Sequence, residues 1–260
     1  MSRIAILTRP DGRNDVLAER LRGAGWHVVA LPALVLEPLP QTQPLPRPHD
    51  YDLVVFVSGS AARLYLEQAA GLLPMGWPVA VPIAVVGPAS ARALRESPLI
   101  GADTTVLHPA EHAPAHDSEA LWHILSGRPI PRRVLLVRGT QGRDWLAGRL
   151  ADAGAQVTPH ALYRRRPASW TPAAAAQLRD WAARGEQAVW LLTSGEGIDA
   201  TAAAVREAGL QDWWRGCRFI VTHPRLAAHL RAAADGGDQV PMVKNCVPAD
   251  EAIFQAFVTA

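Results

Sequence analysis

The sequence predicts an α/β protein in which parallel sheets are covered by helices on both faces. Three observations favour this class. Short, nearly continuous apolar runs, which are typical of buried parallel strands, alternate with amphipathic segments. Motifs from the first half of the chain return in the second half in the same order. Two proline-containing polar segments interrupt the alternation where linkers would lie.

Six apolar runs are the expected strands. Each has the length that is usual for a strand, and most of them end in a hydroxyl residue or a glycine. In chain order they are residues 4–8, 53–58, 83–87, 134–138, 189–194 and 219–222.

The segments between these strands carry a helical pattern. Leu17, Leu21 and Ala24 can share one face of a helix. Gly25 and Gly154 stand where the end of a helix favours glycine. Strand, helix and strand in this order predict right-handed crossovers between parallel strands.

Two pairs of segments resemble each other. Residues 3–38 and 133–167 both give a basic residue, an apolar run, a polar turn, an amphipathic segment ending in Ala-Gly and a valine-led run. Residues 51–94 and 187–230 form the second pair. Within this second pair of segments, two pairs of matched residues are each separated by 136 positions, namely Ser58 with Ser194 and Pro88 with Pro224. A constant offset argues against chance, so the chain is divided into four segments in the order A, B, A′, B′.

The proline-containing breaks suggest where the chain passes between domains. Residues 38–48 (PLPQTQPLPRP) and 164–172 (RRRPASWTP) are poorly suited to continue a helix or a central strand. From the residues alone, two arrangements stay open. A could pair with B and A′ with B′, or B and A′ could form one continuous domain of about 49–163, flanked by a split domain made of A and B′.

Composition and charge argue against several classes of protein. The net charge of +2, from 26 Lys+Arg and 24 Asp+Glu, is too small to indicate general binding of nucleic acid. No apolar run approaches the length of a membrane span and no signal peptide is found, so we expect a cytoplasmic protein without membrane association. Cys217 and Cys246 have neither metal spacing nor the pattern of a disulfide scaffold.

A run of histidines at first suggests a metal site. His108, His112 and His116 are spaced four residues apart, but Pro109 and Pro114 interrupt the segment. We therefore interpret these histidines as solvated loop residues and expect no metal.

The dinucleotide-binding, Walker and nucleophile-elbow motifs are absent from the sequence, and the turn after the first predicted strand reads TRPDGR.

The strand ends supply the candidate binding residues, because open α/β sheets bind ligands beyond the carboxyl ends of their strands. Hydroxyl groups, glycines and helix amides at such ends can hold anions. Hydroxyl residues at these positions also cap helices, so ordinary capping is the alternative explanation for each of them. The candidates are Thr8, Arg9, Ser58, Gly59, Ser60, Gly87, Ser90, Arg138, Gly139, Ser194, Gly195 and Thr222.

Tyr163, one of three tyrosines in the chain, is the candidate catalytic residue. It follows the last strand of segment A′ and precedes Arg164, Arg165 and Arg166. A phenol at this place can donate a hydrogen bond or a proton to a leaving hydroxyl, or it can simply keep its hydroxyl in water. The arginines can steer a carboxylate-rich ligand or keep a linker in solution.

The ordered set of motifs resembles the uroporphyrinogen-III synthase family. The motifs are ILTRP, FVSGSAAR, AVVGPASARAL, VLLVRGTQGRDWLAGRLADAGAQV followed by ALYRRRP, and LLTSGEGI, and they cover roughly residues 3–230. The resemblance implies two parallel-sheet α/β domains, flavodoxin-like in fold, joined by a two-stranded linker. It also implies the split arrangement, with domain 1 at 1–36 plus 172–260, domain 2 at 49–163, and linkers at 37–48 and 164–171.

The same resemblance implies an activity. The enzyme would be a cyclising lyase that converts hydroxymethylbilane, a linear tetrapyrrole with eight carboxylates, into uroporphyrinogen III with loss of water and inversion of ring D. It would use no cofactor and no metal, and would bind its substrate between the domains through backbone amides and hydroxyls. We expect a monomer whose partner is this small molecule, with no nucleic acid.

Residue roles follow from the resemblance by position. Tyr163 would assist departure of the hydroxyl. Arg9 and Arg138 would pair with substrate carboxylates. The hydroxyl positions that would line the cleft are Thr8, Ser58, Ser90 and Ser194.

The chain departs from the family pattern after the last predicted strand. There the family has Gly-x-x-Thr, whereas this chain has His223 in the glycine position and Leu226 in the threonine position. The alternative prediction is therefore a non-catalytic, two-lobed module that binds a small anion or serves in regulation.

Overall fold

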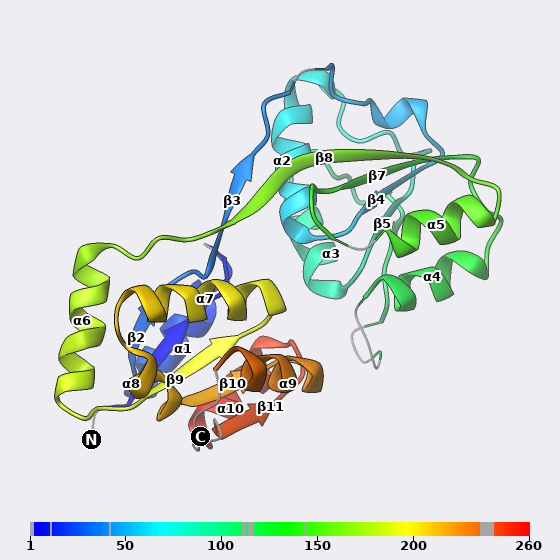
Figure 1. Cartoon of the computed structure of the whole chain (residues 1–260). Coiled ribbons are helices and arrows are strands. Elements are labelled where there is room, and N and C mark those ends of the chain that lie inside the picture. Colours follow the sequence, from blue (N-terminus) through cyan, green and yellow to red (C-terminus); the bar gives the residue numbers. More distant parts are fainter. Residues whose placement is uncertain are drawn as a thin grey trace. The chain divides into compact units, whose positions relative to one another are not determined.

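The computed structural model describes residues 3–10, 12–41, 43–110, 113, 117–142, 144–234 and 242–260. The chain divides into two compact units. Unit 1 comprises Met1–Leu36 and Arg166–Ala260, and unit 2 comprises Glu37–Arg165. Unit 1 is thus assembled from both ends of the chain, whereas unit 2 is one continuous segment (Figure 1). The limits of the linkers, 37–48 and 164–171, stay a prediction.

Unit 1 is built on a five-stranded sheet in the order β11-β10-β9-β1-β2. All neighbouring strands are parallel, and β1 pairs with β9 so that Leu7 lies opposite Leu191. The strands are β1 (Ile4–Leu7), β2 (His27–Ala30), β9 (Ala188–Leu192), β10 (Arg218–Val221) and β11 (Met242–Asn245).

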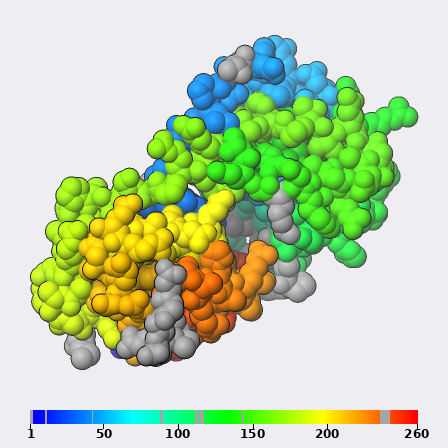
Figure 2. All heavy atoms as spheres, viewed as in Figure 1, coloured from blue at the N-terminus to red at the C-terminus, as the bar shows by residue number. Residues whose placement is uncertain are grey.

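Helices cover both faces of this sheet (Figure 1). Alternate residues of β1 point to opposite faces, so Ile4 and Ile6 enter one apolar core while Ala5 and Leu7 enter the other. The first core is closed by α6 (Pro172–Ala183), α7 (Gly195–Glu207), α8 (Gln211–Arg215) and α9 (Pro224–Ala233), and the second by α1 (Asp15–Gly23) and α10 (Asp250–Val258). In Figure 2, α7 and α9 lie side by side in yellow and orange, as their mutual contacts require.

Unit 2 is built on a six-stranded sheet in the order β3-β8-β7-β4-β5-β6, to which β3 and β8 also bring residues of unit 1. Neighbours from β8 to β6 are parallel. The strands are β3 (Leu34–Pro38), β4 (Leu53–Phe56), β5 (Ile83–Val85), β6 (Val106–Leu107), β7 (Arg133–Gly139) and β8 (Gln156–Pro167). β3 and β8 run antiparallel, since the Leu39 amide donates to the Leu162 carbonyl at 2.8 Å and the Ala168 amide to the Ala33 carbonyl at 2.9 Å.

The helices of unit 2 also pack on its sheet. One core joins α4 (Ser118–Ser126) and α5 (Trp145–Asp152) to alternate residues of β4 and β7, such as Leu53 and Leu136. α2 (Gly59–Ala69) and α3 (Pro88–Arg95) contact each other and the strands, with the Phe56 and Tyr65 rings 5.5 Å apart. Two short 3-10 helices, Pro48–Asp50 and Ala70–Leu72, complete the unit.

The structure confirms the predicted α/β class. Every one of the six predicted apolar runs contains a strand, namely β1, β4, β5, β7, β9 and β10. Gly25 and Gly154 follow helices with φ of 81° and 96°, which is the left-handed conformation expected after a helix end. Among the described residues, no helix combines the length and the apolar character that crossing a membrane would need.

One prediction about the end of segment A′ is wrong. Tyr163 was expected to follow the strand, with a polar break at 164–172, but β8 continues through Tyr163 and Arg164 to Pro167. The strand can extend because β3 continues to hydrogen-bond to it after the pairing with β7 ends at Tyr163. A search for apolar runs does not find this part of the strand, because its residues are arginines.

Candidate functional site

The strand ends of unit 2 form a small pocket around Tyr163. Its volume is about 160 Å³. Three predicted site residues, Ser58, Arg138 and Gly139, line it together with Tyr163. We call it the Tyr163 pocket; the other residues that line it are Val57, Ser118, Leu136, Gln141, Gly142, Leu146 and Arg165.

An irregularity between β7 and β8 sets the position of Tyr163. Arg138 is paired with Ala161, but the next residue, Gly139, is paired with Tyr163, so Leu162 is an extra residue on β8. A bulge of this kind bends a strand and changes the direction of the side chain that follows. As a result the consecutive residues Leu162 and Tyr163 are both buried, whereas strand alternation would bury only one of them.

Gly139 leaves the space that the Tyr163 ring occupies. A Cβ atom at this position would lie 2.7 Å from Cε2 and 3.0 Å from Cζ of Tyr163. Such distances are shorter than carbon atoms tolerate. The glycine predicted as a binding residue therefore also has a steric reason for its identity.

Ser58 connects the start of α2 to Tyr163. Its Oγ accepts a hydrogen bond from the Ala61 amide at 3.0 Å, which is the usual N-cap interaction. The same oxygen lies 3.1 Å from the Tyr163 hydroxyl. Capping was the alternative explanation for this serine, and the geometry shows capping together with a second contact to the candidate catalytic residue.

Arg138 organises the turn that follows β7. Its Nη1 forms an ion pair with Asp144, Nη2 donates to the Gly142 carbonyl at 2.8 Å, and Nε donates to the Gly139 carbonyl at 3.1 Å. All three nitrogens thus have partners within the same turn. A substrate carboxylate would have to share or displace Asp144, which is largely exposed.

The other predicted residues of unit 2 lie at two helix starts and do not line the Tyr163 pocket. Gly59 is the first residue of α2 and Ser60 the second, and both are half-buried. Gly87 is the N-cap residue of α3, and Ser90 is buried in the first turn of that helix.

In unit 1, Thr8 and Arg9 point their polar groups into the protein. Thr8 is buried, and its hydroxyl donates to the Leu191 carbonyl at 2.5 Å. Arg9 is also buried, with Nε donating to Asn14 Oδ1 at 3.1 Å and Nη1 paired with Asp250 at 2.6 Å. Thr8 thus ties the end of β1 to β9, and Arg9 ties it to the start of α1 and to α10.

Ser194 and Gly195 begin α7. The Ser194 Oγ accepts from the Gly197 amide at 3.1 Å, which repeats the cap made by Ser58. A Cβ atom at Gly195 would lie 3.6 Å from Cε1 of His229, an ordinary contact distance. His229 is itself hydrogen-bonded to Asp199 at 2.7 Å.

The end of β10 explains the departure from the family pattern in structural terms. Thr222 is half-buried after the strand. His223 is the N-cap residue of α9, and its Nδ1 accepts from the Arg225 amide at 3.1 Å. Leu226 is buried in an apolar core of unit 1. Histidine therefore caps the helix, and leucine packs where a hydroxyl was expected.

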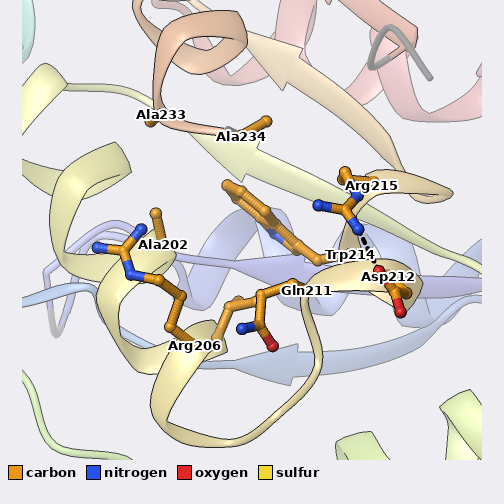
Figure 3. A pocket seen from close by; sticks show the side chains of 9 residues that line it. Ala202, Arg206, Gln211, Asp212, Trp214, Arg215, Ala233 and Ala234 are labelled. Atoms are coloured by element: carbon orange, nitrogen blue, oxygen red, sulfur yellow. Dashed lines mark hydrogen bonds and ion pairs between the residues drawn. The ribbon is translucent and has the colours of Figure 1, made fainter. Parts of the chain in front are cut away.

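A second cavity, of about 300 Å³, lies in unit 1 away from the strand ends. It is lined by the later turns of α7, by α8, and by Ala233 and Ala234 at the end of α9. Figure 3 shows Trp214 within this lining, with Arg206 and Arg215 to either side and Arg215 paired with Asp212. It includes no predicted site residue and adjoins the start of β10, so it is not the candidate site.

Of the three histidines at four-residue spacing, one lies within the described residues. His112 and His116 lie outside the described residues, and His108 shares a hydrogen bond with the Pro109 carbonyl at 2.8 Å. Over the part of the chain that the structure describes, His, Cys, Asp and Glu form no group of three or more suited to a metal. Both cysteines are unbridged, and burial raises the pKa of the Cys217 thiol to about 11.

Sequence reasoning missed two polar residues of the Tyr163 pocket, Ser118 and Gln141. Ser118 follows the N-cap Asp117, which accepts from the Ala120 amide at 2.9 Å. Gln141 accepts from the Arg165 amide at 3.2 Å and so ties the turn after β7 to β8. The Asp-Ser helix start was a readable signal for Ser118, but the contact between Gln141 and Arg165 depends on the bulge and had none.

Comparison with protein families gives one match over most of the chain. The model for the family HEM4, described as uroporphyrinogen-III synthase HemD, matches residues 15–244. Two relatives are both named uroporphyrinogen-III synthase. The protein from Escherichia coli K12 is 26% identical over 227 residues, and that from Salmonella typhimurium LT2 is 28% identical over 230 residues. Each alignment covers 85% of this chain and 88% of the relative.

Solved structures show the same fold. A uroporphyrinogen-III synthetase from Helicobacter pylori 26695 gives a TM-score of 0.58 at 13% identity, with 100% of this chain and 99% of the other covered. A mutant uroporphyrinogen III synthase from the extremely thermophilic bacterium Thermus thermophilus gives 0.55 at 19% identity, with 100% and 98% covered. At such identities the likeness concerns the fold alone.

Proposed function

The chain belongs to the uroporphyrinogen-III synthase family, and we propose that it catalyses the reaction for which the family is named. It would cyclise hydroxymethylbilane to uroporphyrinogen III, with loss of water and inversion of ring D. This would make it a cyclising lyase of porphyrin and heme biosynthesis. The single observation that best supports the proposal is the buried Tyr163 phenol, which lines a pocket at the strand ends with its hydroxyl 3.1 Å from Ser58.

The proposed reaction needs little help from strongly acidic or nucleophilic side chains of the protein. A pyrrole nitrogen can expel the terminal hydroxyl once that group receives a hydrogen bond or a proton, which leaves an electrophilic azafulvene. The hydroxyl departs with the electron pair of its carbon–oxygen bond and takes up one proton to become water. The pyrrole carbon that closes the ring loses one proton, so the reaction balances without a cofactor.

Tyr163 has the properties that the hydroxyl-departure step needs. Its side chain is held by the bulge and by contact with Gly139, so its hydroxyl has a defined place at the pocket wall. A donor that is already positioned loses little entropy when the reaction begins. We propose that this hydroxyl donates to the leaving group.

The size of the pocket limits what it can hold. Sites for small molecules usually have volumes of about 300–1,000 Å³. At about 160 Å³, the Tyr163 pocket suits one pyrrole ring or one carboxylate arm rather than a whole tetrapyrrole. We propose that it receives the hydroxymethyl end of the substrate.

The remaining predicted contacts stay proposals. They are Thr8, Arg9, Gly59, Ser60, Gly87, Ser90, Arg138, Gly139, Ser194, Gly195 and Thr222. Because Arg9 and Arg138 already have acidic partners, Asp250 and Asp144, we propose that amides and hydroxyls contribute more to carboxylate binding than these two guanidiniums. A cytoplasmic monomer that uses no metal or cofactor also stays a proposal, from the family resemblance.

An isomer assay tests the function. The purified protein is given hydroxymethylbilane, and the type I and type III products are separated and quantified after oxidation. We expect mainly type III, at a rate far above that of the heat-denatured protein, and the same result with a metal chelator present. Formation of type I alone, at the spontaneous rate, would contradict the enzyme assignment.

The alternative function is a non-catalytic module that binds a small anion. One observation favours it: Leu226 is buried in an apolar core and His223 caps α9, so the hydroxyl that the family pattern has at the position of Leu226 is missing. The same assay separates the two functions. A module would leave the isomer ratio at its spontaneous value while still binding the substrate in a titration.

A further inference from the structure

The Tyr163 side chain has one degree of freedom that its packing does not restrain. Tyr163 is 3% exposed and its ring rests against Gly139, so the ring cannot swing away from the pocket wall without moving the strands. The hydroxyl hydrogen can still rotate about the carbon–oxygen bond. A donor to a leaving group needs this hydrogen to point at the ligand rather than at the protein.

Ser58 is the hydrogen-bond partner that controls this rotation. A serine hydroxyl has one hydrogen to donate and two lone pairs that accept. The Ala61 amide already takes one lone pair at 3.0 Å, and the Tyr163 oxygen lies at 3.1 Å. Two arrangements remain: Tyr163 donates to Ser58, or Ser58 donates to Tyr163.

Only the second arrangement leaves the Tyr163 hydrogen available for the substrate. It also satisfies Ser58, which then accepts from the Ala61 amide and donates to Tyr163. In the first arrangement the Ser58 hydrogen would need another acceptor, and no protein group among the described residues accepts it.

We infer that Ser58 is a positioning residue that donates its hydrogen to the Tyr163 oxygen and so keeps the Tyr163 hydrogen directed at the leaving hydroxyl. The inference rests on the proposed function. It gives Ser58 a role through Tyr163 rather than the direct contact with substrate that the sequence suggested. The same hydrogen bond stabilises the Tyr163 oxygen as negative charge develops on it.

Comparison with the other helix caps separates this role from capping. Asp117, Thr171 and Ser194 each accept one amide hydrogen at the start of α4, α6 and α7. Within the described part of the chain, none of these three shows a second side-chain partner like that of Ser58. Capping therefore accounts for the bond to Ala61 and leaves the bond to Tyr163 unexplained.

The test uses the full-length protein in the type III isomer assay with variants of Ser58. Ser58→Ala is expected to lower kcat about tenfold with KM changed less than twofold, because the substrate still binds. Ser58→Thr keeps both the cap and the donor and should restore kcat to within about threefold of the original protein. Thr171→Ala removes a cap of the same kind on α6 and should leave kcat unchanged. If Ser58→Ala does not fold, Ser58→Gly replaces it, because glycine is tolerated at N-caps.

A double-substitution cycle with Tyr163→Phe gives the decisive measurement. Once the Tyr163 hydroxyl is absent, Ser58→Ala should lower kcat no further. An equal tenfold loss in the Tyr163→Phe background would overturn the inference, and so would a raised KM with unchanged kcat in the single variant. If the unaltered protein forms no type III isomer, the proposed function fails and the inference fails with it. If type III forms and Ser58→Ala keeps full kcat, only the inference fails.

Discussion

The two units present related strand ends that differ in where their polar groups point. Ser58 in unit 2 and Ser194 in unit 1 are repeat partners, and both cap a helix through an amide three residues later. Arg138 lies near the end of β7 and Arg9 just beyond the end of β1, which are the first strands of the two matched segments. Arg138 is paired within its own turn beside a pocket, whereas Arg9 is buried and paired with Asp250 at the far end of the chain.

The repeat therefore determines the strand-to-helix framework of both units but not the Tyr163 pocket. The matched sequences give strand-to-helix turns in both units and the same serine cap at the starts of α2 and α7. The Tyr163 pocket depends on the bulge in β8 and on a glycine under a tyrosine ring. Neither the tyrosine nor its glycine contact has a counterpart among the matched residues of unit 1.

The largest expected effect comes from removing the Tyr163 hydroxyl. Tyr163→Phe should lower kcat about 100-fold, because a positioned donor to a leaving group contributes on this order. Its thermal midpoint should change little, since the ring stays in place. Tyr51→Phe, at a tyrosine of unit 2 that does not line the pocket, is the matched control and should keep full turnover. Turnover of Tyr163→Phe within twofold of the original would remove the residue from the mechanism.

Two glycine substitutions compare the strand ends directly. Gly139→Ala places a methyl group 2.7 Å from the Tyr163 ring, whereas Gly195→Ala places one 3.6 Å from His229. We expect Gly139→Ala to lower the free energy of unfolding by about 1–3 kcal/mol through overpacking. Gly195→Ala should change it by less than about 0.5 kcal/mol. Urea denaturation measures both, and equal losses would show that the two edges are packed alike.

Two arginine substitutions test the difference in how exposed the acidic partners are, since the Asp250 side chain is 43% exposed and that of Asp144 is 85% exposed. Arg9→Met leaves Asn14 and Asp250 without their buried partner, and we expect a loss of about 2 kcal/mol in the free energy of unfolding. Arg138→Met should cost about 1 kcal/mol, because Asp144 is exposed and regains water. Chemical denaturation of both variants gives the values. A larger loss for Arg138→Met would reverse the comparison.

The smallest expected effect is a pH dependence from His160, which lies on the same strand as Tyr163. Burial lowers the pKa of His160 below its usual 6.5, and its Nε2 has no hydrogen-bond partner in the described structure. The unfolded chain therefore binds this proton more readily than the folded chain. The contribution of neutral His160 to the free energy of unfolding is therefore complete above pH 6.5 and is lost as the pH falls below that value.

Replacement of His160 by a residue that does not titrate isolates this contribution. We expect His160→Gln to lose less stability than the original protein between pH 7 and pH 5, measured by urea denaturation at each pH. Parallel curves for the two proteins would show that other groups carry the acid sensitivity.

Much of the framework could be predicted because it is encoded locally. Apolar runs marked six strands, and serine and glycine at their ends marked the helix starts, since these signals need only neighbouring residues. The residues of the Tyr163 pocket were found in part for the same reason. Ser58 and Gly139 lie directly at strand ends.

The remaining features depend on contacts between distant residues. The sequence places Tyr163 after a strand, because nothing local reveals that β3 pairs with β8 beyond it. The pairing of Arg9 with Asp250 joins residues 241 positions apart, so a strand-end arginine could not be recognised as a structural one. The bulge beside Gly139 arises from the pairing of β7 with β8, so the sequence of neither strand alone predicts it.

The discontinuity of unit 1 has a consequence for synthesis on the ribosome. β1 is hydrogen-bonded to β2 and β9, and β9 lies about 180 residues further along the chain. At roughly 5–20 residues per second, the edge of β1 that pairs with β9 waits on the order of 10–40 s for its partner. The whole of unit 2 emerges during that interval and can fold first. A newly made chain therefore exposes this edge of β1 to chaperones or to a neighbouring nascent chain until β9, early in its last third, has been translated.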